Sequence, residues 1–161
     1  RFESDSELEA SSLSYDDYME QKYVTNLASS YDSNVLKPLN TINLAKIAGA
    51  VRYIIERTLE IHPDCYIIFA TPTQSTKHAF KNQKRAVRDY KWICQRMGVP
   101  IIDVWSESQI VTSFDYGDNH NYLSDGIHEF PGDLPNGCTK GAEKIGNFII
   151  NEFSNKYYSS N

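Results

Sequence analysis

The chain has 161 residues, of which 40% are hydrophobic and 23% are charged, and its formal net charge is −5 at pH 7. A chain of this size can bury the core of one globular domain, and it is too apolar to belong to the disordered class. It contains no run of about 18 consecutive apolar residues, so we expect neither a membrane-spanning segment nor a membrane partner.

The negative charge is concentrated at the start of the sequence. Residues 1–20 hold seven acidic residues against Arg1, a balance of −6, so the remaining residues balance at +1. The one basic stretch, residues 77–96, is typical of the solvated face of a helix. No standard nucleic-acid-binding module accompanies it, and we expect no nucleic-acid partner. Three scattered cysteines predict neither a disulfide framework nor a zinc site.

The first half of the chain changes character near residue 40. Residues 1–40 show little periodicity, and we expect an acidic, polar, irregular lead segment with a short helix near residues 15–27. From Leu44 to Leu59 apolar residues recur every three or four positions, which predicts a helix that starts at Asn40 or Thr41 and ends before Pro63. The apolar run 65–70 that follows is typical of a strand covered on both faces.

The second half repeats this alternation. A helix is expected over residues 81–97 with Gly98 as its stop, then a strand over 99–104, a long polar stretch, and a last helix with an apolar stripe. This order predicts an α/β fold with a parallel sheet. Because two strands make too narrow a sheet for three amphipathic helices, we expect the missing strands upstream of Arg1 or on another chain.

The strongest candidate site follows the second strand. In the block Ser-Asp-Gly-Ile-His, Asp125 and His128 are three residues apart, so the carboxylate can orient the imidazole while the other ring nitrogen takes a proton from a nucleophile. Asp-Gly is also a common turn, and an isolated match of this kind favours the turn.

The surrounding motifs give this block more weight. They are the helix TINLAKIAGAVRY, the strand ending in Thr71-Pro72, the strand Val-Pro-Ile-Ile-Asp, and the closing block before Gly141-Ala142. In this order residues 41–161 resemble the carboxyl-terminal part of the SGNH/GDSL hydrolase family. The resemblance implies a flavodoxin-like three-layer α/β/α fold with a parallel sheet, incomplete in this chain. It also implies ester hydrolysis of acyl or acetyl groups, with His128 as general base and Asp125 as its orienter.

The chain departs from the family pattern at two places. Glu129 stands where the closing block has a proline, and an insert, residues 130–140, follows it. The Gly-Asp-Ser nucleophile block and the Gly-x-Asn-Asp block are absent from the sequence, and Asp5-Ser6 is only a superficial match. We therefore expect the serine on an upstream segment or another chain, and no activity from this chain alone. Trp105 and Glu129 are candidate substrate-binding residues.

Several alternatives stay open. Asp103 could partner His128, although it fits better as an anchor of the following loop. A group of acids and histidines could form a metal site, but the spacing of Asp115, Asp118, His120, Asp125 and His128 matches no standard pattern. We expect no metal or cofactor, an acylated small molecule or carbohydrate as partner, and a secreted, cell-surface or virion-associated protein rather than a cytoplasmic one. The second functional hypothesis is a non-catalytic SGNH-like module that binds glycan or protein in a larger assembly.

Overall fold

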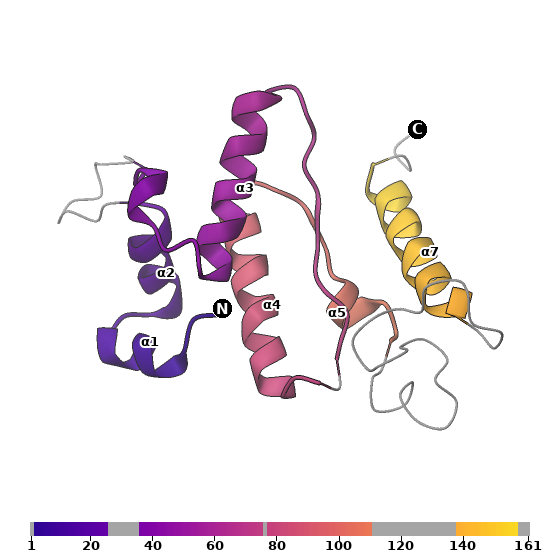
Figure 1. Cartoon of the computed structure of the whole chain (residues 1–161), viewed down its shortest axis with the longest axis horizontal. Coiled ribbons are helices and arrows are strands. Elements are labelled where there is room, and N and C mark those ends of the chain that lie inside the picture. Colours follow the sequence, from indigo (N-terminus) through magenta and orange to yellow (C-terminus); the bar gives the residue numbers. More distant parts are fainter. Residues whose placement is uncertain (1, 26–35, 76, 111–137, 158–161) are drawn as a thin grey trace. The chain divides into compact units, whose positions relative to one another are not determined.

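The structure is a computed structural model that describes residues 2–25, 36–75, 77–110 and 138–157. Helices dominate these residues, and a short 3-10 turn, η1, covers Leu39–Thr41. The helices are α1 (Asp5–Ser11), α2 (Tyr15–Tyr23), α3 (Ile47–Ile61), α4 (Phe80–Arg96), α5 (Val104–Glu107) and α7 (Cys138–Tyr157), and the strands are β1 (Phe69–Ala70) and β2 (Ile101–Ile102) (Figure 1).

The prediction of a three-layer α/β/α fold is wrong. The described residues are mostly helical, and their one sheet consists of β1 and β2, which pair in parallel with Phe69 opposite Ile101. The two apolar runs were expected to be full strands buried on both faces, yet Ala70 and Tyr66 are exposed. A strand extends only as far as a neighbour offers backbone partners, and two short strands cannot form a layer with two covered faces.

The described residues fall into two compact units. Unit 1 contains residues 1–67 and 88–99, and unit 2 contains residues 68–87 and 100–161. Within the lead segment expected over residues 1–40, α2 matches the short helix expected near residues 15–27, and α1 is an additional helix; both belong to unit 1. The buried apolar side chains of unit 1 come from α2, α3 and α4 and from residues next to these helices. They are Tyr18, Met19, Tyr23, Val24, Ile42, Ala48, Val51, Ile55, Ile93, Cys94 and Val99.

Local sequence explains the first two helices. Ser4 caps α1, with the Glu7 backbone N–H donating to Ser4 Oγ at 3.2 Å and the Ser4 N–H donating to Glu7 Oε2 at 3.2 Å. This reciprocal pairing satisfies two backbone donors that the first helical turn leaves unpaired. Ser14 caps α2 in the same way, by accepting from the Asp17 N–H.

The helix α3 buries Ala48, Val51 and Ile55 of the predicted stripe but leaves Ile54 and Leu59 exposed. It also begins later than expected. Lys46 is its N-cap, without a side-chain cap, and His62 is its C-cap, just before Pro63. The buried Arg52 side chain donates to the backbone carbonyl oxygens of Tyr23, Val24 and Lys37. It therefore joins the two chain segments that flank residues 26–35, next to an antiparallel bridge between Thr25 and Leu36.

Unit 2 is built on the strand pair. Its buried apolar residues among those described are Val87, Ile102, Val104 and Ile110. The helix α7 contacts β2 and α5, and its Lys144 ammonium group donates to the Gln109 carbonyl oxygen at 2.7 Å. The apolar stripe expected on α7 is present, but Ile145, Phe148, Ile149 and Phe153 are only partly buried.

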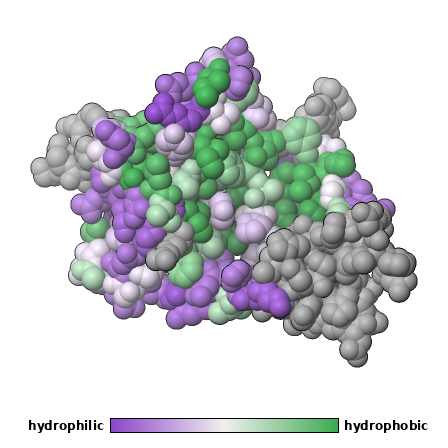
Figure 2. Space-filling view, in the orientation of Figure 1, coloured by the Kyte–Doolittle hydropathy of each residue, from purple (hydrophilic) through white to green (hydrophobic). Residues whose placement is uncertain are grey.

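Several large apolar side chains remain at the surface. Tyr66, Ile61 and Phe80 are 65%, 69% and 59% exposed, and Figure 2 shows hydrophobic groups among the hydrophilic ones on the face in view. Within the described part of the chain, no helix combines the length and apolar content needed to cross a bilayer.

Candidate functional site: the carboxyl ends of the strand pair

The carboxyl ends of β1 and β2 place two polar residues side by side. Thr71 follows β1 and Asp103 follows β2, and the Thr71 hydroxyl donates to Asp103 Oδ1 at 3.2 Å. Both residues are buried. The parallel register aligns these ends, because the Thr71 N–H donates to the Ile102 carbonyl oxygen at 3.0 Å. Loops at this edge of a parallel sheet commonly carry ligand sites.

Asp103 holds the start of α5. Its carboxylate accepts from the Ser106 backbone N–H at 3.2 Å, which caps the helix. An N-cap of this kind contributes about 1 kcal/mol. The expectation that Asp103 anchors the segment after the strand is therefore confirmed. His128, the alternative partner expected for Asp103, lies outside the described residues.

Trp105 is fixed at this edge by hydrogen bonds to its backbone and ring. Its N–H donates to Thr71 Oγ1 at 2.9 Å, its carbonyl oxygen accepts from Gln74 Nε2 at 3.1 Å, and its indole N–H donates to Gln83 Oε1 at 3.4 Å. The indole is partly buried. Trp105 is a candidate substrate-binding residue from its sequence, and the structure places it just after the carboxyl end of β2.

Gln83 connects the loop after β1 to α4. Its side-chain oxygen accepts from the Ser75 N–H at 2.8 Å, and its Nε2 donates to the carbonyl oxygens of Ser75 and His78 at 2.6 and 2.7 Å. The amide thus holds Ser75 and His78 while it also contacts the Trp105 ring. His78 is exposed in this loop, as its sequence context predicts.

Phe80 packs against Trp105 and was not singled out from the sequence. The two ring centroids are 5.1 Å apart with an interplanar angle of 37°. Phe80 is the first residue of α4 and is 59% exposed. It directly precedes the helix expected over residues 81–97, and an aromatic residue that follows the polar segment 73–79 was the available signal.

The predicted catalytic pair is not among the residues that the structure describes. Asp125, His128 and Glu129 all lie in residues 111–137, as do the acids and histidines of the alternative metal site. Ser6, the superficial nucleophile match, is exposed in the first turn of α1. In the described ranges, no three His, Cys, Asp or Glu side chains are grouped so that they could hold a metal ion.

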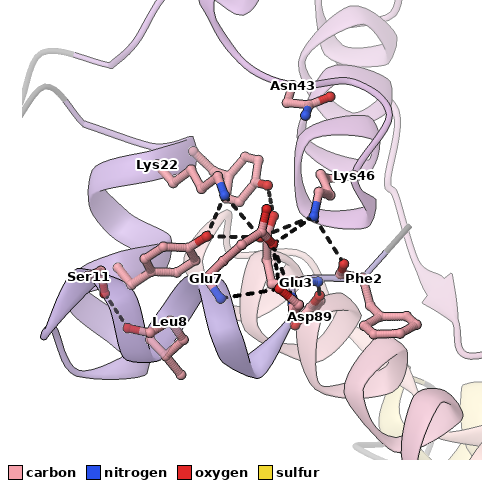
Figure 3. A network of polar contacts seen from close by, with 12 residues as sticks. Phe2, Glu3, Glu7, Leu8, Ser11, Lys22, Asn43, Lys46 and Asp89 are labelled. Carbon is pink, nitrogen blue, oxygen red and sulfur yellow. Dashed lines mark hydrogen bonds and ion pairs between the residues drawn. The ribbon is translucent and has the colours of Figure 1, made fainter.

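Unit 1 contains a second polar cluster, centred on the buried carboxylate of Glu3 (Figure 3). Glu3 accepts hydrogen bonds from the hydroxyls of Tyr18 and Tyr23 and from the Lys22 ammonium group. The Lys46 ammonium group lies 3.5 Å from the same carboxylate and donates to the Phe2 carbonyl oxygen at 3.3 Å. Four donor groups, three from α2 and one from the N-cap of α3, therefore converge on one acid.

Asp89 of α4 extends this cluster. Its carboxylate accepts from the Glu3 backbone N–H at 2.7 Å and from the Tyr15 hydroxyl at 2.8 Å, and Arg88 lies 3.2 Å away. Burial raises the pKa of Asp89, although these hydrogen bonds oppose the shift. Burial, together with the Asp89 charge, also raises the pKa of Tyr15.

The Glu3 and Asp89 cluster is a structural clamp in unit 1. No buried side-chain polar atom among the described residues lacks a hydrogen-bond partner, so the cluster shows no unsatisfied group awaiting a ligand. The sequence assigned Glu3 to a solvated acidic lead. Three tyrosines and a lysine within residues 15–23 were the signal that this lead could bury a carboxylate.

Comparisons with known proteins add information on the fold. No protein-family model and no curated protein matches the chain. A solved crystal structure is similar, with a TM-score of 0.57 and 22% sequence identity. The alignment covers 74% of this chain and 57% of that one, so this chain spans less than two thirds of the other's length. At this identity the likeness concerns the fold alone.

Proposed function

We propose that residues 122–128 supply the aspartate and histidine of a serine ester hydrolase, and that the serine comes from outside these 161 residues. The carrying observation is the block Ser124-Asp125-Gly126-Ile127-His128, placed in the chain after the second of two parallel strands. The parallel pairing and the polar edge at Thr71 and Asp103 support this proposal, because such edges commonly hold ligand sites.

The proposed reaction passes through an acyl-enzyme. His128 takes the proton of the serine hydroxyl as the serine oxygen attacks the ester carbonyl carbon, and it returns that proton to the leaving alcohol. A water molecule then attacks the acyl-serine and loses its proton to His128, which passes that proton to the serine oxygen as the acyl–oxygen bond breaks and the carboxylic acid is released. Asp125 holds the imidazole in the required tautomer and stabilises the imidazolium. No metal takes part in these steps.

The test is hydrolysis of p-nitrophenyl acetate by the full-length protein. Asp125→Ala and His128→Ala should each lower kcat by about 10³-fold or more, because removal of one triad member disables the group as a unit. Unchanged activity in both variants would refute the assignment and would favour the non-catalytic glycan- or protein-binding module.

A matched control separates the triad from the alternative metal site. Asp118 and His120 lie in the same segment and belong to that alternative but not to the triad. Asp118→Ala and His120→Ala should retain activity, and chelation with EDTA should leave it unchanged. Loss of activity in these two variants, reversed by added divalent metal, would replace the triad with a metal site.

A further inference from the structure

Phe80 and Trp105 form an aromatic pair at the carboxyl ends of the strands. Their rings are 5.1 Å apart and tilted by 37°, and Phe80 is 59% exposed. An aromatic side chain this exposed leaves a large apolar area in contact with water. Aromatic side chains beside polar groups are typical of small-ligand sites.

The pair is held in place before any ligand arrives. The Trp105 ring is fixed by its hydrogen bond to Gln83, and its backbone is fixed by Thr71 and Gln74. Gln83 in turn fixes the loop that leads into Phe80. A preorganised surface loses little conformational entropy on binding.

The chemistry of this surface selects among ligands. The indole N–H and the Gln83 amide are engaged within the protein, so what the exposed Phe80 side chain offers a ligand is aromatic carbon rather than hydrogen-bonding groups. A pyranose ring has one face of C–H bonds that can lie against an aromatic ring while its hydroxyls stay in water. The negative face of an aromatic ring attracts such weakly positive C–H groups.

From these observations we propose that Phe80 and Trp105 form a sugar-binding platform that receives the carbohydrate part of the substrate. The substrate class is then an acylated polysaccharide or oligosaccharide. This inference rests on the proposed ester hydrolase for its substrate role, and it adds Phe80 as a binding residue. A nucleobase could stack on the same rings, so single-stranded nucleic acid is included in the test.

The test is native affinity electrophoresis of the full chain through gels containing acetylated xylan, deacetylated xylan or poly(U). We expect retardation in both xylan gels. Phe80→Ala should raise the apparent Kd for xylan about tenfold, as expected for loss of one aromatic contact. Phe80→Tyr should keep the affinity, since it keeps the ring.

Tyr66→Ala is the matched control. Tyr66 is a similarly exposed aromatic residue, at 65%, in unit 1. This variant should migrate like the parent protein. Because Phe80 is exposed, its replacement should also leave the melting temperature nearly unchanged, which separates lost binding from lost folding.

Other outcomes would overturn the platform or separate it from the hydrolase. No retardation by either xylan, equal retardation of Phe80→Ala and the parent, or Phe80-dependent retardation in poly(U) alone would each overturn the platform. Asp125→Ala and His128→Ala should bind xylan like the parent. Phe80-dependent binding without esterase activity in the full-length protein would refute the hydrolase and leave a glycan-binding site.

Discussion

Glu3 differs from the exposed acids Glu7 and Glu9 of α1 in being almost fully buried, at 1% exposure. Its carboxylate is compensated by two tyrosine hydroxyls and two lysine ammonium groups. A buried charge with this many partners stabilises the fold only while every partner is present, since each partner is itself removed from water. The residues before α1 are thereby tied to unit 1.

Replacing Glu3 tests this clamp. Glu3→Gln should lower the free energy of unfolding by roughly 3 kcal/mol, because it removes the buried counter-charge of Lys22 and one of the two counter-charges of Lys46. Urea denaturation of the full chain measures the change. Glu9→Gln replaces an exposed acid in the adjacent helix α1 and should change stability by less than about 0.5 kcal/mol. Equal effects of the two substitutions would contradict the clamp.

Glu7 makes a pH-dependent contribution. A hydrogen bond from Lys46, with further bonds from Ser4, lowers the pKa of Glu7 to about 2. A carboxylate with a depressed folded-state pKa adds stability that is present above its unfolded pKa and is lost as the pH falls toward 2. The side chain is 43% exposed, so the gain is less than about 1 kcal/mol.

The measurement compares the parent protein with Glu7→Gln across pH. Glutamine keeps the capping partner of Ser4 but removes the charge. The variant should therefore be less stable at pH 7, and the difference should shrink between pH 4.5 and 2. A difference that is constant over this range would show that the charge of Glu7 does not contribute.

At the scale of elements, hydrophobic periodicity predicts the long helices of this chain well and the lengths of its strands poorly. The helices α3 and α4 lie close to the predicted ranges because a helix satisfies its backbone hydrogen bonds internally. Only two residues of each expected strand, 65–70 and 99–104, are paired in the structure, because a strand depends on neighbours that its own sequence does not specify. Helix starts were also missed: neither Asn40 nor Thr41 caps α3.

Glycine-to-alanine substitutions at three positions test the local geometry of the helices. At Gly98, which ends α4 with φ of 68°, alanine should cost about 1 kcal/mol because left-handed backbone disfavours a side chain. At Gly49 in α3, an added Cβ would lie 2.3 Å from the Asn43 carbonyl oxygen, so the loss should be larger, about 2–3 kcal/mol.

Gly146 is the matched control in α7. An added Cβ there meets no atom within 4 Å, so Gly146→Ala should stabilise the protein by up to about 1 kcal/mol through helix propensity. Thermal unfolding of the three variants should rank them Gly146→Ala, Gly98→Ala and Gly49→Ala in decreasing order of stability. Any other order would contradict the helix geometry described above.

At the scale of the molecule, sequence patterns predicted the parallel strand pair but not the organisation around it. A near-neutral body behind an acidic lead suggested one boundary near residue 40, whereas the buried Glu3 places the start of the chain inside unit 1. Long-range pairing of Glu3 with Lys46 and Asp89 leaves no periodic signal in the sequence. Trp105 was identified from its place after a strand, and its partner Phe80 became visible only in three dimensions.

The central claim is that Asp125 and His128 serve a serine outside these 161 residues. A fluorophosphonate probe reacts with activated serines, and peptide mapping by mass spectrometry identifies the modified residue. In the full-length protein, we predict one modified serine outside the present sequence, with labelling abolished in His128→Ala and strongly slowed in Asp125→Ala. Modification of a serine within these 161 residues, or labelling that both substitutions leave unchanged, would contradict the account.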